Sequence, residues 1–325
     1  MVCGMIFDTF NKVFNHSSSH ILLYHSTFRR VPSDLFGEIH NVTPDEFYKQ
    51  LKWLKSHFDV VAVDELLCLK DLKGKAAITF DDAYKSVFEE ALPILKSLNM
   101  PCTIFINGCT LDKRVFWRDK VRYIINAALV SEFIESNKQF CKKNCIDENN
   151  FYRRTKHHEL NSIEVESLLD KFFKVKGIRL ELLSYCIDDP RILSSHDLVS
   201  YGSHSYSHYV MSSLTKEQQH EEVVKNINFF NKHNIKHSQI FSIPFGDENS
   251  FDDTTIALLE QYNYKGFVYS RNRLNSVFKN KYASNGSSSI YFSDRYMPRS
   301  SFSSFQSQIA VLKFRKMLGF HRVRL

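Results

Sequence analysis

The feature that most constrains this chain is a short apolar run that ends in two adjacent aspartates. Residues 76–80 read Ala-Ala-Ile-Thr-Phe and are followed directly by Asp81, Asp82 and Ala83. A short apolar and β-branched run between polar residues is typical of a buried strand. Both carboxylates then lie at its carboxyl end, where α/β folds collect their functional groups. Neighbouring carboxylates repel each other unless a cation or a shared proton intervenes, so this pair indicates a metal site.

Further metal ligands occur much later in the chain. Residues 201–208 read Tyr-Gly-Ser-His-Ser-Tyr-Ser-His, with His204 and His208 four positions apart. One aspartate and two histidines supply three protein ligands and leave one coordination position open, as in catalytic zinc sites. Taken alone, one of the aspartates could instead cap a following helix, and the histidines could be surface loop residues. The metal interpretation therefore requires the two segments to meet in the fold.

Strands and helices are expected to alternate in the first and last thirds of the chain, which favours a parallel sheet or barrel. Strands are expected at 21–24, 59–63, 76–80, 101–106, 198–200, 239–243 and 266–269, and helices from Pro44 onward and over 84–98, 215–233 and 252–262. The pattern breaks at 116–190, which reads mostly as helices. We therefore expect an α/β barrel built from 1–115 and 191–300, a helical insertion at 116–190 and a C-terminal helix at 301–325.

Bulk properties indicate an ordinary globular protein of 325 residues, with 43% hydrophobic and 24% charged residues. We find no apolar run long enough to span a membrane and no secretory signal, and the seven scattered cysteines fit reduced thiols, so we expect a cytoplasmic location. The net charge of +7 comes with no nucleic-acid motif and no phosphate-binding glycine loop, so no nucleic-acid partner is expected. The sequence gives no indication of an oligomeric state.

The C-terminal segment mixes apolar and basic residues at helical spacing, at 309–318 and again at 321–324. Such a helix could make peripheral contact with an anionic membrane surface, here the inner face of the membrane. Because the segment is short, a helix that closes the domain and exposes a solvated basic face is the favoured interpretation.

Three motifs resemble those of the polysaccharide deacetylases, the NodB-type carbohydrate esterases. Thr-Phe-Asp-Asp-Ala at 79–83 is similar to their first motif, and Ser-His-Ser-Tyr-Ser-His at 203–208 is similar to their second. Phe-Ser-Ile-Pro-Phe-Gly at 241–246 resembles the third, which flanks the substrate groove. Tyr24-His25 and 41–47 look like members that act on partially acetylated surface polysaccharides, and they extend the similarity to roughly residues 20–270.

The resemblance implies a distorted (β/α) barrel that removes N-acetyl groups from an amino sugar of a polysaccharide, glycolipid or sugar-nucleotide precursor. Asp82, His204 and His208 would bind a divalent metal, commonly zinc in this family, and Asp81 would be the general base. These roles agree with chemistry, because a cation lowers the pKa of bound water and a free carboxylate can take its proton. Pro244, Phe245 and Gly246 would bind substrate.

Two departures from the family pattern bear on the mechanism. Ser242 stands where many members have an arginine that holds the base, and residues 267–302 contain no match for the late histidine that usually acts as general acid. His25 is our candidate for the acid. Arg295 or Arg299 could serve the substrate or the base, and we assign Arg299 to the substrate. Two alternatives stay open, a hydrolase of another amide or formamide and an inactive carbohydrate-binding barrel.

Overall fold

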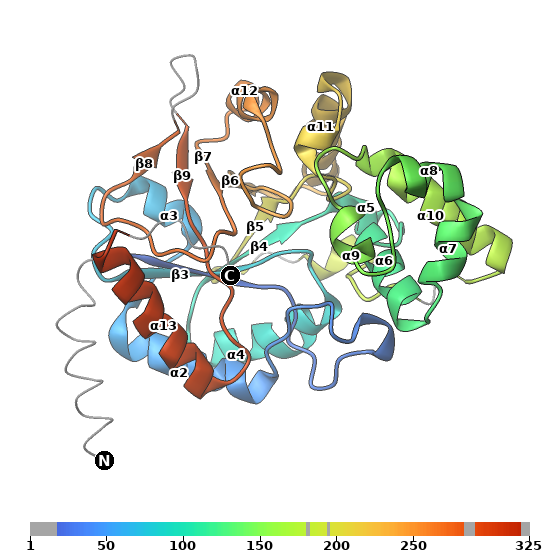
Figure 1. The fold of residues 1–325 in the computed structure, drawn as a ribbon. Helices are drawn as coiled ribbons and strands as arrows, with labels where there is room; N and C mark the ends of the chain where they lie inside the picture. The colour runs from blue at the N-terminus through green and yellow to red at the C-terminus, as the bar shows by residue number, and fades with distance from the viewer. Residues whose placement is uncertain (1–17, 180–182, 194–195, 283–289, 320–325) are drawn as a thin grey trace.

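The computed structural model describes residues 18–179, 183–193, 196–282 and 290–319. Its centre is a curled sheet with the strand order β1-β3-β4-β5-β6-β7-β9-β8, in which β2 also pairs with β3 (Figure 1). Only β8 and β9 pair antiparallel within the described sheet. The strands are β1 (His20–Tyr24), β2 (Asp59–Val60), β3 (Lys75–Phe80), β4 (Cys102–Ile106), β5 (Val199–Ser203), β6 (His237–Ser242), β7 (Gly266–Val268), β8 (Asn280–Lys281) and β9 (Tyr291–Ser293).

The sheet curls until β1 meets the segment that follows β9. The Leu23 amide donates a hydrogen bond to the Tyr296 carbonyl at 2.9 Å, and the Tyr296 amide donates to the Ile21 carbonyl at 3.1 Å. Because the partners lie at opposite ends of the described chain, these bonds bring the first and last strands together. The expected α/β fold of the distorted-barrel type is confirmed.

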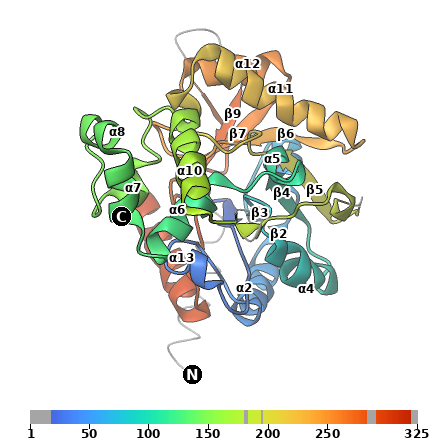
Figure 2. The ribbon, with the colours of Figure 1, turned by 90° about the vertical axis from the view of Figure 1, so that its right-hand side faces the viewer.

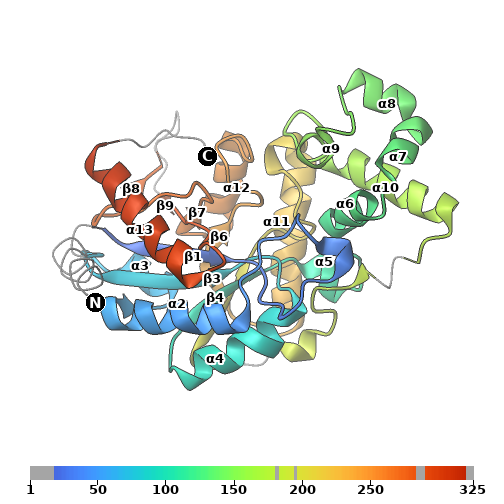
Figure 3. The ribbon, with the colours of Figure 1, turned by 60° about the horizontal axis from the view of Figure 1, so that its bottom comes forward.

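Helices cover the outside of the curled sheet, and α2 and α13 lie side by side (Figure 3). They are α2 (Pro44–His57), α3 (Val63–Cys68), α4 (Leu92–Ser97), α11 (Lys216–Lys232), α12 (Asp253–Gln261) and α13 (Phe302–Met317). The start of α11 is fixed by a capping box in which Thr215 and Gln218 exchange hydrogen bonds. No helix in the described ranges is long and apolar enough to cross a membrane.

A second group of helices stands to one side of the sheet in Figure 1 and comes to the front in Figure 2. It contains α6 (Trp117–Asn126), α7 (Val130–Ser136), α8 (Lys138–Lys143), α9 (Phe151–Arg154) and α10 (Ser162–Lys176). These helices share a core around Trp117, Phe133 and Phe173 that is separate from the core beneath the sheet. The short α5 (Gly108–Leu111) contacts α11, and its Leu111 belongs to the core beneath the sheet. The segment expected as a helical insertion, 116–190, contains α6 to α10. That this segment forms a separate domain stays a prediction.

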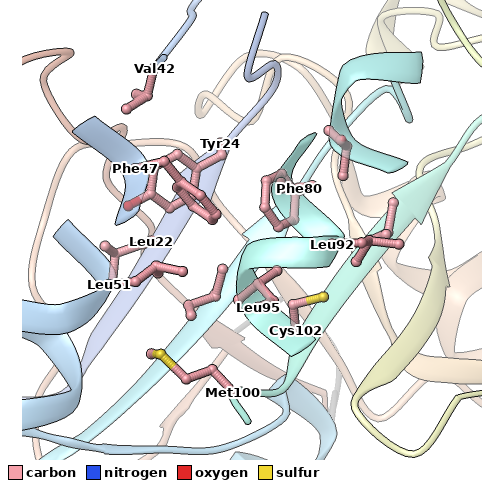
Figure 4. Packing of buried hydrophobic residues seen from close by; sticks show 14 of the residues in the cluster. Leu22, Tyr24, Val42, Phe47, Leu51, Phe80, Leu92, Leu95, Met100 and Cys102 are labelled. Carbon is pink, nitrogen blue, oxygen red and sulfur yellow. The ribbon is translucent and has the colours of Figure 1, made fainter. Parts of the chain in front are cut away.

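Alternation along the strands decides which side chains reach the barrel interior. Leu22 and Tyr24 of β1 pack outward against Phe47 and Leu51 of α2 (Figure 4). Ile21, the residue before Leu22, belongs to a different cluster, which joins Ala77, Ile240 and Val268 from other strands. Since side chains two positions apart share a face, a residue such as Asp81 lies in phase with the inward Ala77.

Two expected elements were wrong in extent. The strand expected at 59–63 ends at Val60, because Val63 begins α3 with acidic residues in the first turn, Asp64 and Glu65. The single helix expected over 84–98 is instead a π-helical segment, Val87–Ala91, followed by α4. Pro93 lies in the first turn of α4 and lacks an amide hydrogen, so a regular α-helical bond pattern cannot run through this point.

Candidate metal centre

Three potential ligands from two distant segments meet at the carboxyl ends of β3 and β5. The Asp82 Oδ1 atom lies 3.6 Å from Nε2 of His204 and 3.3 Å from Nε2 of His208. The three ligand atoms all lie within 4.8 Å of one another, and all three residues are buried. The structure therefore brings together the residues that the sequence proposes as metal ligands.

The loops that carry these residues adopt strained backbone conformations. Left-handed φ angles occur in each of the three motif segments, at Asp82 (67°), Ala83 (54°), Ser205 (57°), His208 (59°), Phe245 (63°) and Gly246 (62°). Non-glycine residues rarely adopt this region, and each costs on the order of 1–3 kcal/mol. The surrounding structure must hold these loops in place, and such concentrations of strain are typical of functional sites.

The free atoms of the cluster fit a divalent cation. Nδ1 of His204 lies 2.9 Å from the Ser242 carbonyl oxygen, which fixes the tautomer that donates there and leaves Nε2 with a free lone pair facing Asp82. Oδ1 of Asp82 is buried and accepts no hydrogen bond within the described part of the chain. Burial and the neighbouring Asp81 carboxylate raise the pKa of Asp82 well above its usual value, so its charged form needs a cation beside it. Two imidazole nitrogens and one carboxylate form a common zinc donor set.

Asp81 lies beside this cluster, with Oδ2 3.5 Å from Nε2 of His204, and a buried arginine holds its carboxylate. Arg295 donates to both carboxylate oxygens of Asp81, at 2.8 and 2.7 Å, and the Ser242 hydroxyl lies 3.1 and 3.2 Å from the same oxygens. Burial alone would raise the pKa of Asp81, but Arg295 and the nearby His204 bring it down to about 2. Asp81 is therefore an ionised carboxylate with a fixed orientation.

Arg295 takes the place of the guanidinium that is missing from the third motif. It is fully buried, donates from Nε to the Tyr269 carbonyl at 3.1 Å and contacts the Ser242 hydroxyl at 2.8 Å. The sequence offered Arg295 and Arg299 as candidates for binding either the substrate or the base, and in the structure Arg295 binds Asp81. It comes from the segment after β9, which closes the barrel against β1.

A cavity of about 260 Å³ opens over the metal centre. His25, which follows β1, lines it together with Asp81, and Nδ1 of His25 is buried with no hydrogen-bond partner in the described ranges. Burial lowers the pKa of His25 well below its usual value, although Asp81 opposes this. His25 thus faces the cavity, but its lowered pKa favours the neutral ring over the protonated form that an acid needs, and its catalytic role stays a prediction.

The residues assigned to substrate binding lie at different places. Phe245 lines the cavity, and its ring centroid is 4.6 Å from that of His208. Pro244 and Gly246 form the same turn, where the Gly246 carbonyl accepts a hydrogen bond from the Ser270 amide at 2.7 Å. Arg299 is exposed and is not among the residues that line this cavity. Contact of any of these with a substrate stays a prediction.

Residues of the helical insertion complete the cavity, and the sequence did not predict them. Trp117 is buried and donates to the His208 carbonyl at 3.0 Å, so it supports the loop that carries this ligand. Arg118, Arg122, Tyr152 and Lys156 line the cavity. Arg118 and Arg122 are four positions apart on α6, and so are Tyr152 and Lys156 in and after α9, but no local signal joins the two pairs into one wall.

Comparisons with known proteins agree with this geometry. A family model for polysaccharide deacetylases matches residues 70–144 and 191–267, which contain Asp81, Asp82, His204 and His208. A poly-β-1,6-N-acetyl-D-glucosamine N-deacetylase of Staphylococcus aureus (strain MSSA476) is 40% identical over 73 residues, covering 21% of this chain and 25% of that protein. The protein of the same name from Staphylococcus epidermidis is 32% identical over 108 residues, covering 29% and 37%. The chain thus aligns with well under half of the length of these relatives.

Solved structures share the fold at low sequence identity. The deacetylase PplD of Streptococcus pyogenes, solved in complex with acetate, superposes with a TM-score of 0.53 at 15% identity over 92% of this chain and 99% of its own. IcaB of Ammonifex degensii gives 0.52 at 14% identity over 91% and 97%. Together with the family model and the buried Asp-His-His group, these matches place the chain in the polysaccharide deacetylase family.

Proposed function

We propose that this protein is a metal-dependent N-deacetylase that removes acetyl groups from an amino sugar of a polysaccharide, glycolipid or sugar-nucleotide precursor. The observation that carries the proposal is the convergence of Asp82, His204 and His208 beside a separate carboxylate, Asp81, that a buried arginine orients. Amide hydrolysis needs both parts, because an electrophile and a base must act on the same water. The relatives' name, poly-β-1,6-N-acetyl-D-glucosamine N-deacetylase, supports an N-acetylated amino sugar as the substrate class.

The chain's own residues would divide the work as follows. Asp82, His204 and His208 would hold a divalent cation, which supplies a water of lowered pKa and a positive charge for the developing oxyanion when bound. A carboxylate oxygen of Asp81 accepts the proton of the attacking water, while Arg295 and Ser242 keep that oxygen aimed into the cavity. His25, which also lines the cavity, would in its protonated form donate a proton to the leaving amine nitrogen.

Zinc is the cation we propose, on the grounds of the donor set. Two imidazole nitrogens with one carboxylate oxygen suit zinc better than magnesium or calcium, which prefer oxygen ligands. Metal analysis of the purified protein tests this, with one zinc per chain as the expected result. Thermal unfolding in the presence and absence of a chelator gives a second readout that does not depend on turnover.

Acetate release is the test of the activity. Asp81→Asn should abolish acetate release from N-acetylated amino-sugar substrates while one metal per chain is retained, because Asp81 is not a ligand. Asp197→Asn, which alters an exposed carboxylate just before the amino end of β5, away from the ligands that follow its carboxyl end, is the matched control and should keep full activity. Loss of metal in Asp81→Asn would contradict the separation of ligand and base.

The same assay separates the two alternative functions. Faster release from simple amides or formamides than from amino sugars would identify a hydrolase of another amide. Sugar binding without acetate release in the metal-loaded wild-type protein would identify an inactive carbohydrate-binding barrel. No feature of the described site favours either alternative over deacetylation.

We also propose a cytoplasmic location with peripheral contact of α13 at the inner membrane surface. Three apolar side chains on its C-terminal half and one on the residue that follows it are exposed, and Lys316 and Arg315 lie among them. The apolar residues are Val311, Phe314, Met317 and Leu318. Co-sedimentation with anionic and neutral vesicles tests this contact: Phe314→Ser should reduce binding to anionic vesicles, whereas Phe278→Ser, at another exposed phenylalanine, should not. Cell fractionation tests the location.

A further inference from the structure

The wall of the cavity that the helical insertion supplies carries positive charge. Arg118 and Arg122 lie on α6, and Lys156 follows α9. Arg122 is paired, since Nη1 contacts an Asp119 carboxylate oxygen at 2.6 Å. Neither Arg118 nor Lys156 forms an ion pair with a carboxylate anywhere in the described ranges. Two cations therefore face the cavity without a protein counter-ion.

Arg118 is unusual because its charge is buried and only neutral groups contact it. The side chain is 1% exposed, and its Cζ atom lies 4.7 Å from the Trp117 ring centroid and 4.8 Å from that of Tyr152. Two of its N–H groups donate to the Thr155 hydroxyl and the Tyr152 carbonyl, at 3.1 and 2.9 Å. The Nε atom is buried and has no hydrogen-bond partner in the described part of the chain. A buried guanidinium with an unused donor is costly unless an anion completes its surroundings.

Lys156 extends the same positive region along the lining of the cavity. It is half-buried, and its Nζ atom lies 4.7 Å from the Tyr152 ring centroid and 5.6 Å from that of Phe245. Burial alone would raise the pKa of Tyr152, yet Arg122, Arg118 and Lys156 lower it below its usual value. The tyrosine thus reports a positive field on this wall.

The carboxylates near this wall do not neutralise it. Asp81 is committed to Arg295, and Asp82 faces the histidines. Glu38 also lines the cavity, and its backbone carbonyl accepts a hydrogen bond from Arg122, but its carboxylate pairs with neither Arg118 nor Lys156. Asp247, which is exposed, attracts Lys156 without forming an ion pair. An anion bound in the cavity would neutralise the charges of Arg118 and Lys156.

We propose that Arg118 and Lys156 bind an anionic group of the substrate, a phosphate or a carboxylate, while the N-acetyl group lies at Asp82, His204 and His208. The inference rests on the proposed deacetylase function and adds the charge of its substrate. Planar guanidinium and ammonium donors bind such oxyanions through charge-assisted hydrogen bonds.

The position of Phe245 sets the spacing between the two groups. Its ring lies 4.6 Å from the His208 ring, 5.9 Å from Arg118 Cζ and 5.6 Å from Lys156 Nζ. The metal centre and the two cations therefore adjoin the same aromatic ring. The anion is expected on the same sugar as the N-acetyl group or on its immediate neighbour, and a long neutral or cationic polymer would leave the two cations unmatched.

Equilibrium binding to the metal-loaded full chain at low ionic strength tests the proposal. N-acetylglucosamine 1-phosphate is expected to bind at least about tenfold more tightly than the uncharged methyl glycoside of N-acetylglucosamine. Lys156→Gln should bring the two affinities to within about twofold of each other. Lys142→Gln, at an exposed lysine of α8, is the control and should leave the preference intact. A phosphate bound only through the metal would retain its preference in Lys156→Gln, and that result would overturn the proposal.

Arg118 needs two variants because it is fully buried. Arg118→Met should remove the preference for the anionic probe, and Arg118→Lys should restore part of it. If Arg118→Met does not fold, the Lys156 comparison still decides. An Arg118→Met protein that is less stable but keeps the full preference would show that Arg118 only supports the insertion, which would also overturn the proposal.

Further probes distinguish the source of the anion. A nucleotide-diphosphate sugar, a sugar 1-phosphate and a disaccharide that carries a uronic acid are compared in wild-type protein and in Lys156→Gln. The probe whose affinity falls most in Lys156→Gln identifies the anionic group of the substrate. If no probe binds more weakly to Lys156→Gln than to the wild type, the proposal is overturned. Because binding needs no turnover, a protein that binds anions through Lys156 but never releases acetate would retain this site and lose the deacetylase function.

Discussion

Replacing Arg295 by methionine should destabilise the protein and impair the base together. Arg295 and Asp81 form a two-bond ion pair that is wholly buried, so the substitution leaves a carboxylate in the interior without its counter-charge. The pKa of Asp81 falls from 3.8 to about 2 in the folded protein, which corresponds to a favourable contribution of about 2.5 kcal/mol at about 1.4 kcal/mol per unit. Burial would raise the same pKa in the variant, so we expect a loss of about 3–5 kcal/mol at neutral pH.

The pH dependence of this loss has a definite sign. In the wild-type protein the Asp81 pKa is depressed, so its contribution is present above the unfolded pKa near 4 and is lost as the pH falls toward about 2. In Arg295→Met the pKa is raised, so ionisation of Asp81 opposes folding as the pH rises above about 4. The difference in free energy of unfolding between the two proteins should therefore be largest at neutral pH and should shrink in acid. Urea unfolding at several pH values measures it.

A double-mutant cycle decides whether the ion pair is the cause. Asp81→Asn removes the buried charge, so Arg295→Met should cost much less in the Asp81→Asn background than in the wild type. Acetate release from the single variant should fall by about a hundredfold or more, since the base loses its orientation. An equal cost of Arg295→Met in both backgrounds, or the same difference in stability at acidic and neutral pH, would refute this reasoning.

Three further results are expected. Asp82→Ala should lose the bound metal and lower acetate release by about a hundredfold or more, as measured by metal analysis and by the acetate assay, and added zinc should not restore it. Gly202→Ala should cost about 1–3 kcal/mol in urea unfolding, because the new Cβ atom would lie 2.5 Å from the Phe105 ring, and a wild-type midpoint would show that the ring can move aside. His25→Gln should lower kcat with metal content unchanged, and an unaltered pH–rate profile would exclude His25 as the acid.

The parts of the site that the sequence predicted are those with local signals. Residues 76–80 and the aspartates after them predict a buried strand with functional groups at its carboxyl end. In the structure the strand begins one residue earlier, at Lys75. The histidine pair is equally local, because both ligands lie within one loop after β5. Their meeting follows from parallel strands, which bring their carboxyl ends to the same edge.

The sequence did not predict, or left open, the roles of residues that depend on contacts between distant parts of the chain. Arg295 could be placed on Asp81 only once the segment after β9 was known to pair with β1. Lys156 and Arg118 reach one cavity wall through the packing of short helices, where no periodic pattern links them. The change from π-helix to α-helix before Pro93 was not predicted, because the apolar pattern continues through this proline without a break.

The size of Ser242 explains how the chain can hold its base with an arginine from elsewhere. Ser242 ends β6, and its hydroxyl lies 2.8 Å from Arg295 Nη2 and within 3.2 Å of the Asp81 carboxylate, so it occupies the space between β6 and the ion pair. A second arginine at this position would meet the Arg295 guanidinium at close range, and two like charges would compete for one buried carboxylate. Serine there and arginine in the segment after β9 are therefore complementary. The orientation of the base depends on the guanidinium itself, and not on the strand that supplies it.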